Sequence, residues 1–222
     1  GVGHVTRVRP DSLGRYVVDT LARAGLGERP VRVDPRYPTG FQLKGKQTDG
    51  RDPAIEYFRK GSAASHLSLD DFDAEYVAAA RHLHLTGVAP AISATSRELA
   101  FRLAESMRAA GKTISFDPNL RPTLWPSRET MAATLNALAA LSDWVLPGLD
   151  EGIALTGYDT PEDVARFYLD HGARGVIVKL GAQGAYFRTA DSAGYVAAQP
   201  LAEVVATVRA GDGFAVGVVG RK

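Results

Sequence analysis

The sequence predicts an α/β fold of three layers, in which helices cover both faces of a largely parallel sheet and a small β-sheet lid is inserted. Segments with apolar residues at helical spacing alternate with short β-prone segments over most of the chain. Residues 175–180 are predominantly apolar, as in a central parallel strand. Residues 31–60 instead hold β-prone pieces and turns with no helix between them. We therefore assign residues 1–30 and 61–222 to the core and residues 31–60 to the lid.

Composition limits the classes of partner. With 222 residues, 45% hydrophobic and 23% charged, the chain can bury one substantial core. A formal net charge of +1 gives no electrostatic reason to expect nucleic acid or a membrane surface as a partner. Neither a membrane-spanning apolar run nor a signal peptide is recognisable, so we expect a cytoplasmic protein. The absence of cysteine excludes disulfides, thiolate nucleophiles and cysteine-bound metal.

The first elements are a strand, a helix and the lid. After the opening strand, apolar residues recur at helical spacing from Leu13 to Ala24, and Gly25 closes the predicted helix. Short β-prone pieces follow at residues 31–33, 40–43 and 55–58. An antiparallel patch of this kind in an α/β chain is suited to closing over an active site.

One phosphate-binding motif inside the lid is rejected. Residues 40–46 match G-x-x-x-x-G-K, but Gln47 follows where a magnesium-binding Ser or Thr is needed. Both flanks also predict strands, whereas this loop requires a helix after it.

Aromatic and basic residues meet at the end of the lid. Tyr57 and Arg59 alternate along a predicted strand, which places them on one face and Phe58 on the other. An arginine beside a tyrosine hydroxyl suits a carboxylated or polyhydroxylated ligand. From the residues alone, a solvated edge strand is the favoured interpretation.

Caps mark the helices of the core. Ser68 to Asp71 forms a capping-box-like helix start, and Ser93, Ser127 and Thr160 precede further helices, the last with proline at its first position. The strands expected between these helices cover residues 81–85, 113–117, 144–146 and 175–180. Residues 181–184 then turn the chain through two glycines into residues 185–188 and a strand at 195–196.

Three histidines, His66, His82 and His84, do not predict a metal centre. His82 and His84 share a strand face, but no acidic or cysteine partner is near them in the sequence. We interpret them as structural histidines.

Two polar groups follow strands. Residues 117–122, D-P-N-L-R-P, come just after the strand at 113–117, where open α/β sheets bind ligands. Arg121 is the candidate here, and a turn with an Asp–Arg pair is the alternative. Glu151 follows the strand at 144–146, either as a site residue or as a helix first-turn acid favoured by the dipole.

Asp212 is the main catalytic candidate. It precedes the apolar helix at 214–219, whose start offers unpaired N–H groups and the positive end of its dipole. A carboxylate beside such an anion site can accept a proton from a hydroxyl while the N–H groups stabilise a transferring phosphoryl group. Capping of a buried helix is the alternative for Asp212.

These motifs resemble the PfkB, ribokinase-like family of carbohydrate kinases. Thr207, Ala210, Gly211, Asp212 and Phe214 match the family pattern D-T-x-G-A-G-D-x-F, whereas Ala206 and Arg209 depart from it. Arg9 replaces glycine in a second motif, V-G-x-D-x-x-G. An arginine at position 209 either obstructs the turn or adds a charge that pairs with phosphate. The D-P-N-x-R-P element is similar to that of the branch that holds fructokinases and 2-keto-3-deoxygluconate kinases. In the family's N-x-x-E element Gly148 replaces the asparagine, and the resulting L-P-G-x-x-E form is similar to that of the 2-keto-3-deoxygluconate kinases.

The resemblance implies a ribokinase-like fold and an ATP- and Mg²⁺-dependent kinase that phosphorylates the 6-hydroxyl of 2-keto-3-deoxygluconate. Asp212 would be the base, with the N–H groups of Ala210, Gly211 and Asp212 as the anion hole. The remaining implied contacts are Arg121, Tyr57 and Arg59 to the substrate, Glu151 to hydrated magnesium, and Lys179, Gly181, Gly184, Arg209 and Gly211 to the nucleotide.

Alternatives and assembly also follow from the resemblance. The rivals are fructokinase, another sugar kinase of the family, or a non-catalytic sugar- or nucleotide-binding relative in which Ala206 and Arg209 spoil the phosphate loop. Arg59 favours the acid substrate, because fructose lacks a carboxylate. A lid contact between two copies would make a homo-oligomer. The resemblance also implies that both termini are truncated.

Overall fold

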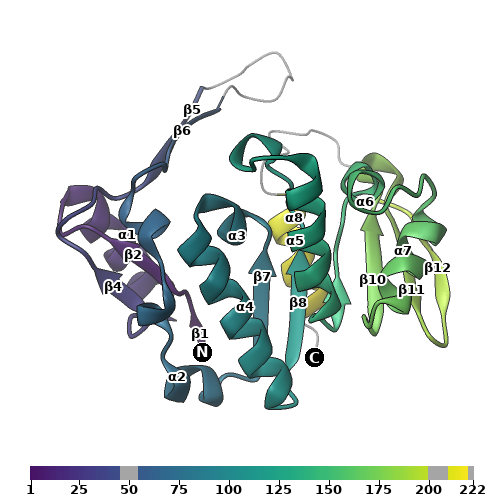
Figure 1. Cartoon of the computed structure of the whole chain (residues 1–222), viewed down its shortest axis with the longest axis horizontal. Helices are drawn as coiled ribbons and strands as arrows, with labels where there is room; N and C mark the ends of the chain where they lie inside the picture. The colour runs from purple at the N-terminus through teal and green to yellow at the C-terminus, as the bar shows by residue number, and fades with distance from the viewer. Residues whose placement is uncertain (46–54, 200–209, 220–222) are drawn as a thin grey trace.

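The structure is a computed structural model that describes residues 1–45, 55–199 and 210–219. Among these residues, six strands form the main sheet in the order β12-β11-β10-β9-β8-β7 (Figure 1). Strands β7 to β10 are parallel, and β11 and β12 extend the sheet in antiparallel fashion. The strands are β7 (His82–Thr86), β8 (Thr113–Asp117), β9 (Trp144–Val145), β10 (Gly175–Lys179), β11 (Ala185–Thr189) and β12 (Ala193–Val196).

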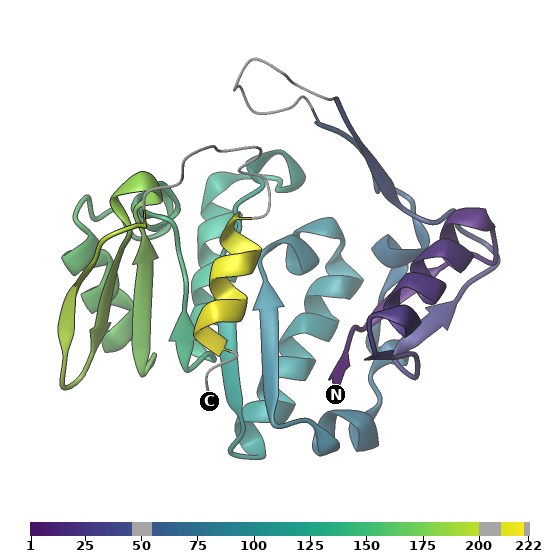
Figure 2. The same ribbon diagram turned by 180° about the vertical axis from the view of Figure 1, so that it is seen from behind.

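Helices lie on both faces of this sheet, which confirms the predicted α/β fold. Helices α4, α5 and α7 cover one face (Figure 1), and α8 lies on the opposite face (Figure 2). The helices that follow the main strands are α3 (Val88–Ile92), α4 (Ala94–Ala109), α5 (Arg128–Ala140), α6 (Leu149–Thr156), α7 (Pro161–Asp170) and α8 (Ala210–Val219). Among the described helices, none is long and apolar enough to cross a membrane.

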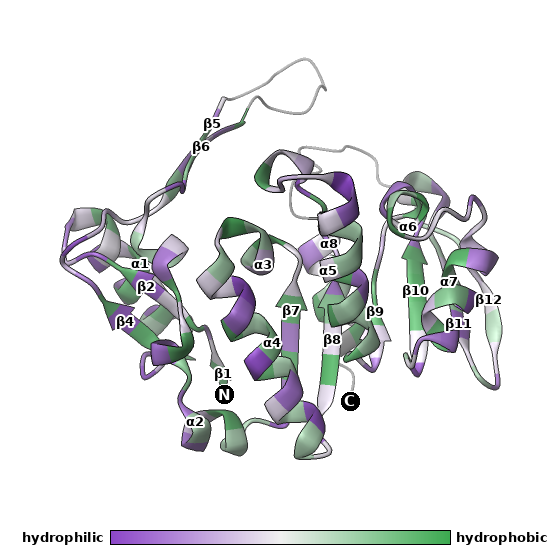
Figure 3. Ribbon diagram, in the orientation of Figure 1, coloured by the Kyte–Doolittle hydropathy of each residue, from purple (hydrophilic) through white to green (hydrophobic). Residues whose placement is uncertain are grey.

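The core lies between the sheet and helices α4, α5 and α7. Ile114, Phe116, Val145, Val176 and Val178 of the strands are fully buried, and the hydrophobic character of β10 is visible in Figure 3. Leu135 and Leu138 of α5 are equally buried against them. Burying each such side chain stabilises the fold by about 1.5–3 kcal/mol.

The predicted caps set the helix boundaries. The side chains of Ser93, Ser127 and Thr160 each accept a hydrogen bond from a backbone N–H in the first turn of α4, α5 and α7. At Ser68 the capping box is present, but it starts only the short 3-10 turn at Leu69–Asp71. The α-helix α2 (Ala74–Ala79) begins later, with Asp73 as its own cap. A further 3-10 turn spans Ala63–His66.

Residues 1–33 form a small lobe beside the main sheet (Figure 1). Its helix α1 (Ser12–Arg23) connects two short parallel pairs: β1 (Val2–Gly3) with β3 (Leu26–Gly27), and β2 (Thr6–Val8) with β4 (Val31–Val33). Strand β4 thus differs from the expectation that residues 31–33 join the antiparallel lid. A strand that follows a crossover helix pairs in parallel with the strand before it, and the local pattern of residues 31–33 does not reveal this.

The segment predicted as the lid contains a two-stranded hairpin. Strand β5 (Phe41–Lys44) pairs antiparallel with β6 (Ile55–Phe58), so that Gln42 lies opposite Tyr57 and Phe41 opposite Phe58. The hairpin extends away from the small lobe, on the side of the molecule to which the arrows of β7 and β8 point (Figure 1). The first part of the rejected G-x-x-x-x-G-K motif is strand β5, and Lys46 lies outside the described residues.

A buried ionic network joins the small lobe to the core. The guanidinium of Arg7 donates to both carboxylate oxygens of Asp71 and also pairs with Asp34 at 3.4 Å. Arg36 donates to Asp34 through its side chain and its backbone N–H, and this lowers the pKa of the Asp34 carboxyl well below its ordinary value. The network fixes the lobe from which the hairpin extends.

Candidate functional site

A cavity of about 350 Å³ lies at the carboxyl ends of the parallel strands, between the core and the hairpin. Most of its lining is polar or charged. The hairpin and the residue after it contribute Gln42, Tyr57 and Arg59. The ends of β8 and β10 and the turn after β8 contribute Asp117, Lys179, Asn119 and Arg121, and the starts of helices α3, α6 and α8 contribute Val88, Glu151, Gly211 and Asp212. A cavity of this size and polarity suits a small hydrophilic ligand.

Helix α8 turns its first residues toward this cavity. The helix begins at Ala210, four residues before the apolar run from which it was predicted, so Asp212 lies inside the first turn. The low helix propensity of the two glycines hides this start in the sequence. Asp212 is exposed at the cavity and, within the described residues, its carboxylate accepts no hydrogen bond. The N–H groups of residues 210–213 have no partner inside the helix and lie at its positive end.

An ion pair that the sequence did not predict lies next to the first turn of α8. Lys179 ends β10 and donates from Nζ to Oδ2 of Asp117, at the end of β8, over 2.8 Å. Asp117 is buried and the Lys179 side chain is 20% exposed. A methyl group placed on Gly211 would lie 3.7 Å from the Lys179 Nζ and 3.9 Å from the Asp117 Oδ2. The ammonium group is therefore close to the helix start that favours an anion.

The histidines of β7 bond to hydroxyl groups. His82 contacts the hydroxyls of Thr113 and Ser115, and His84 Nδ1 lies 2.8 Å from the Ser115 Oγ. Burial lowers the pKa of His84, an effect that the negative charges of Asp117 and Asp212 oppose and that Lys179 reinforces. The lowered pKa favours the neutral form of this ring.

Arg121 and Glu151 come from two segments that meet at the cavity. Arg121 ends the D-P-N-L-R turn, and its Nη1 donates to the carbonyl of Leu120. Glu151 lies in the first turn of α6, where its carboxylate accepts hydrogen bonds from the backbone N–H groups of Gly148 and Leu120. The first of these bonds caps the helix, as a first-turn acid does.

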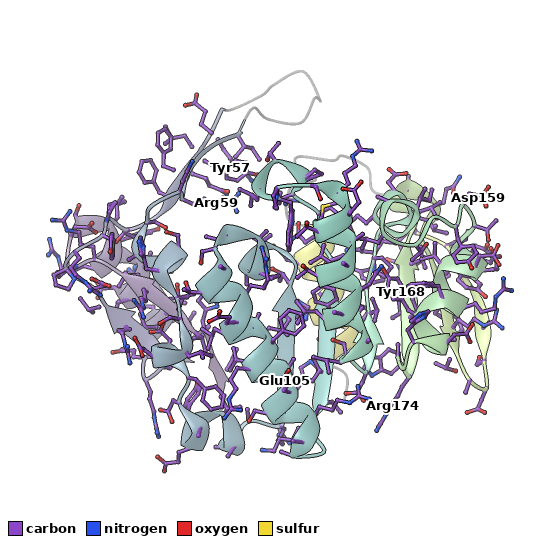
Figure 4. The ribbon with its side chains drawn as sticks, viewed as in Figure 1. Tyr57, Arg59, Glu105, Asp159, Tyr168 and Arg174 are labelled. Atoms are coloured by element: carbon purple, nitrogen blue, oxygen red, sulfur yellow. The ribbon has the colours of Figure 1, made fainter. Side chains whose placement is uncertain are left out.

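The hairpin turns one face to the cavity, as the alternation of Tyr57 and Arg59 predicted. The Arg59 guanidinium lies over the Tyr57 ring at 3.9 Å from its centroid, and both side chains extend from the hairpin toward the core (Figure 4). Gln42 joins them because the hairpin register places it opposite Tyr57. Phe41 and Phe58 stack on the other face. A cation stacked on an aromatic ring and open to the cavity can bind a carboxylate.

A second cavity, of about 380 Å³, is mainly apolar and lies against the next turn of α8. It is lined by Ile177, Gly181, Gly184, Ala185, Phe187, Val196, Ala197, Ala198 and Phe214. Gly184 has a φ of +102°, and a methyl group on it would lie 2.0 Å from the carbonyl oxygen of Val196. Only glycine fits there, so this position shapes the wall of the cavity.

The predicted site residues divide between the two cavities. Asp212, Gly211, Arg121, Glu151, Tyr57, Arg59 and Lys179 line the polar cavity, whereas Gly181 and Gly184 line the apolar one. Sequence reasoning did not select Gln42, Val88, Asp117 or Asn119 as site residues. Asp117 and Asn119 belong to the D-P-N-L-R-P element, and this motif could have identified them as site residues. The position of Gln42 in the cavity depends on the hairpin register, which the sequence does not reveal.

The departures from the family pattern have different outcomes. The backbone N–H of Arg9 donates a hydrogen bond to the Thr39 hydroxyl. Arg9 is not among the described residues with positive φ, so its backbone conformation does not require glycine. Ala206 and Arg209 lie outside the described residues. Within the described residues no group of three or more His, Asp or Glu side chains is arranged to hold a metal ion by itself.

Comparisons with known proteins agree on one family. Residues 2–221 match the profile described as pfkB family carbohydrate kinase. The chain is 47% identical over 219 residues to the 2-dehydro-3-deoxygluconokinase of Bacillus subtilis (strain 168), a match that covers 98% of this chain and 67% of that protein.

Two solved structures have the same fold. The PfkB protein from Polaromonas sp. JS666 superposes with a TM-score of 0.92 at 52% identity, over 99% of this chain and 71% of that chain. A putative ribokinase II from E. coli in complex with ATP and Mg²⁺ superposes with a TM-score of 0.82 at 29% identity, over 91% of this chain and 64% of that chain. The chain thus spans about two thirds of the length of these relatives.

Proposed function

The chain belongs to the pfkB family of carbohydrate kinases, and we propose that it transfers the terminal phosphoryl group of ATP to the 6-hydroxyl of 2-keto-3-deoxygluconate. The observation that carries this proposal is the shared cavity: the exposed carboxylate of Asp212 and the guanidinium groups of Arg121 and Arg59 line one space. The 2-dehydro-3-deoxygluconokinase of Bacillus subtilis, at 47% identity, supports the same substrate.

Asp212 acts as the general base. Its carboxylate accepts the proton of the 6-hydroxyl as the hydroxyl oxygen forms a bond to the terminal phosphorus of ATP. The bond between that phosphorus and the bridging oxygen breaks, and ADP leaves with the electron pair. A carboxylate that is exposed to the cavity and unpaired within the described residues is available for this proton.

Negative charge on the transferring group is stabilised by three sources. The N–H groups of Ala210, Gly211 and Asp212 form the anion hole at the positive end of α8. Lys179, whose ammonium group lies near Gly211, adds a positive charge on one side, and Arg121 adds another from the D-P-N-L-R turn. Charges fixed in advance stabilise the transition state without reorganisation.

ATP is placed along α8. The apolar cavity beside Gly181, Gly184 and Phe214 suits the adenine ring, and it borders the same helix whose first turn receives the phosphates. Glu151 would hold hydrated Mg²⁺, an ion that neutralises phosphate charge when it is bound. The oxygen chemistry of the Glu151 carboxylate fits this ion, and the E. coli relative was crystallised with ATP and Mg²⁺.

The lid selects the substrate. A sugar acid carries a carboxylate that Arg59 can pair with while Tyr57 and Gln42 meet its hydroxyl groups. Fructose offers no such charge, so the same cation gives it no comparable contact. A homo-oligomer formed through the lid remains part of the proposal.

The test is a coupled assay of ADP release with a panel of sugars. The proposal expects 2-keto-3-deoxygluconate to have a higher kcat/KM than fructose or ribose. A preference for fructose would overturn the substrate. Calorimetry that detects ATP or sugar binding in a protein with no turnover would support the non-catalytic alternative instead.

A further inference from the structure

Glu151 connects two segments that are distant in the sequence. Its Oε2 accepts a hydrogen bond from the N–H of Gly148, the cap of its own helix, at 2.8 Å. Its Oε1 accepts a second bond, also of 2.8 Å, from the N–H of Leu120, thirty-one residues earlier. Both carboxylate oxygens therefore bond to backbone, and the side chain joins α6 to the turn that follows β8.

The turn that Glu151 holds contains a residue in an unfavourable backbone conformation. Asn119 has a φ of +39°, the one positive value of a non-glycine residue within the described ranges. Such a conformation is unfavourable unless surrounding contacts maintain it. Two carboxylates supply these contacts: Asp117 accepts the N–H of Asn119 at 3.2 Å, and Glu151 accepts that of Leu120.

The hydrogen bond from Leu120 bears directly on Arg121. The N–H of Leu120 is fixed by Glu151, and the carbonyl of the same residue accepts a 2.7 Å hydrogen bond from Arg121 Nη1. Leu120 is thus held on one side by an acid and supports the guanidinium on the other. A change in the position of Leu120 moves the oxygen that orients Arg121.

We propose that Glu151 is a positioning residue for Arg121, which it keeps directed into the cavity through the backbone of Leu120. This inference rests on the proposed function only for the ligand of Arg121, and the contacts that position Arg121 do not depend on that function. The carboxylate has further lone pairs that can accept hydrogen bonds from the water shell of a hydrated ion. Glu151 can therefore both position Arg121 and hold Mg²⁺, and the experiments below separate these two roles.

The informative substitution is Glu151→Gln. A carboxamide has one acceptor oxygen, so it satisfies one of the two N–H groups and turns an NH₂ group toward the other. The loss of a hydrogen bond to a charged group near the reacting centre lowers kcat/KM by about 10- to 100-fold. Glu129→Gln is the matched control, because Glu129 is an exposed acid in the first turn of α5 and lines neither cavity.

A double-mutant cycle with Arg121→Ala tests the coupling. If Glu151 acts through Arg121, Glu151→Gln lowers kcat/KM for the sugar acid by a larger factor in the wild-type protein than in the Arg121→Ala protein, where only the loss from its metal role is left. Equal losses in both backgrounds would overturn the proposal. A rise in the half-saturating Mg²⁺ concentration, with equal losses in both backgrounds, would assign Glu151 to the metal alone.

Amide exchange gives a readout that does not depend on activity. In ¹⁵N-labelled protein, Glu151→Ala, which removes both acceptor oxygens, is expected to raise the exchange rate of the Leu120 amide about tenfold or more, while Glu129→Gln leaves it unchanged. An unchanged Leu120 rate would refute the contact. If the wild-type protein failed to phosphorylate the sugar acid, the proposed function would fall while this exchange result still tested the positioning role.

Discussion

Replacing Gly211 by alanine is expected to remove most of the activity while the fold stays intact. The added methyl group would lie 3.7 Å from the Nζ of Lys179 and 3.9 Å from the Oδ2 of Asp117, which are ordinary contact distances. Neither group has to move. Alanine also favours the helix by about 0.5–1 kcal/mol relative to glycine, so stability is maintained or slightly increased.

If the first turn of α8 is the anion hole, as proposed, the same methyl group occupies space that a transferring phosphoryl group needs. An oxygen of that group would approach the N–H groups of α8 and the ammonium of Lys179 from the side on which the Cβ of residue 211 projects. Loss of one charge-assisted hydrogen bond there costs about 1.5–3 kcal/mol. This corresponds to a fall in kcat/KM of about 10- to 100-fold.

Gly213→Ala is the matched control for this prediction. A methyl group on Gly213 meets no described atom within 4 Å, although the substitution lies in the same helical turn. Thermal unfolding should give similar Tm values for both variants, and the coupled ADP assay should show a loss only in Gly211→Ala. Equal activity of the two variants, or a marked fall in the Tm of Gly211→Ala, would refute this reasoning.

Two further predictions concern the lid and the small lobe. Arg59→Leu is expected to raise KM for 2-keto-3-deoxygluconate by about 10- to 100-fold, because a charged hydrogen bond is lost. The substitution should have little effect on any residual turnover of fructose. Equal effects on both sugars in steady-state assays would show that Arg59 does not bind the carboxylate. The pKa of Asp34 lies below its ordinary value because Arg36 donates to it. Its contribution to stability is therefore complete above the unfolded-state pKa, decreases below that pKa and is lost fully only below the folded-state pKa. The difference in urea midpoint between wild type and Asp34→Asn should therefore be larger at about pH 7 than at about pH 3, and an equal difference at both pH values would contradict the role of this ion pair.

Local signals in the sequence were sufficient for most of the core. Helix starts were marked by Ser93, Ser127 and Thr160, because a hydroxyl group just before an amphipathic segment can accept a hydrogen bond from the first N–H groups of the helix. The strand at Thr113–Asp117 followed from its apolar residues and from Gly111 before it. These features depend on a few neighbouring residues, and a single sequence records them.

Features that depend on pairing between distant segments were not predictable. The parallel partner of Val31–Val33 is set by the crossover through α1 and not by the composition of the strand. The place of Gln42 in the cavity depends on the hairpin register.

The contacts of the site residues belong to the same category. The Lys179–Asp117 pair joins strands sixty-two positions apart, and Glu151 reaches Leu120 across thirty-one. Motifs identified Lys179, Arg121 and Glu151 as site candidates, but only the fold shows which groups hold them in place.

Asp212 gives the most direct measurement of the central claim, that a carboxylate in the first turn of α8 deprotonates the acceptor hydroxyl. Asp212→Asn keeps the size of the side chain and removes the base, so kcat should fall about 100- to 10,000-fold. Calorimetric affinities for ATP and the sugar acid, and the Tm, should stay close to those of wild type. A variant that binds both ligands and retains more than about a tenth of the wild-type kcat would contradict the account.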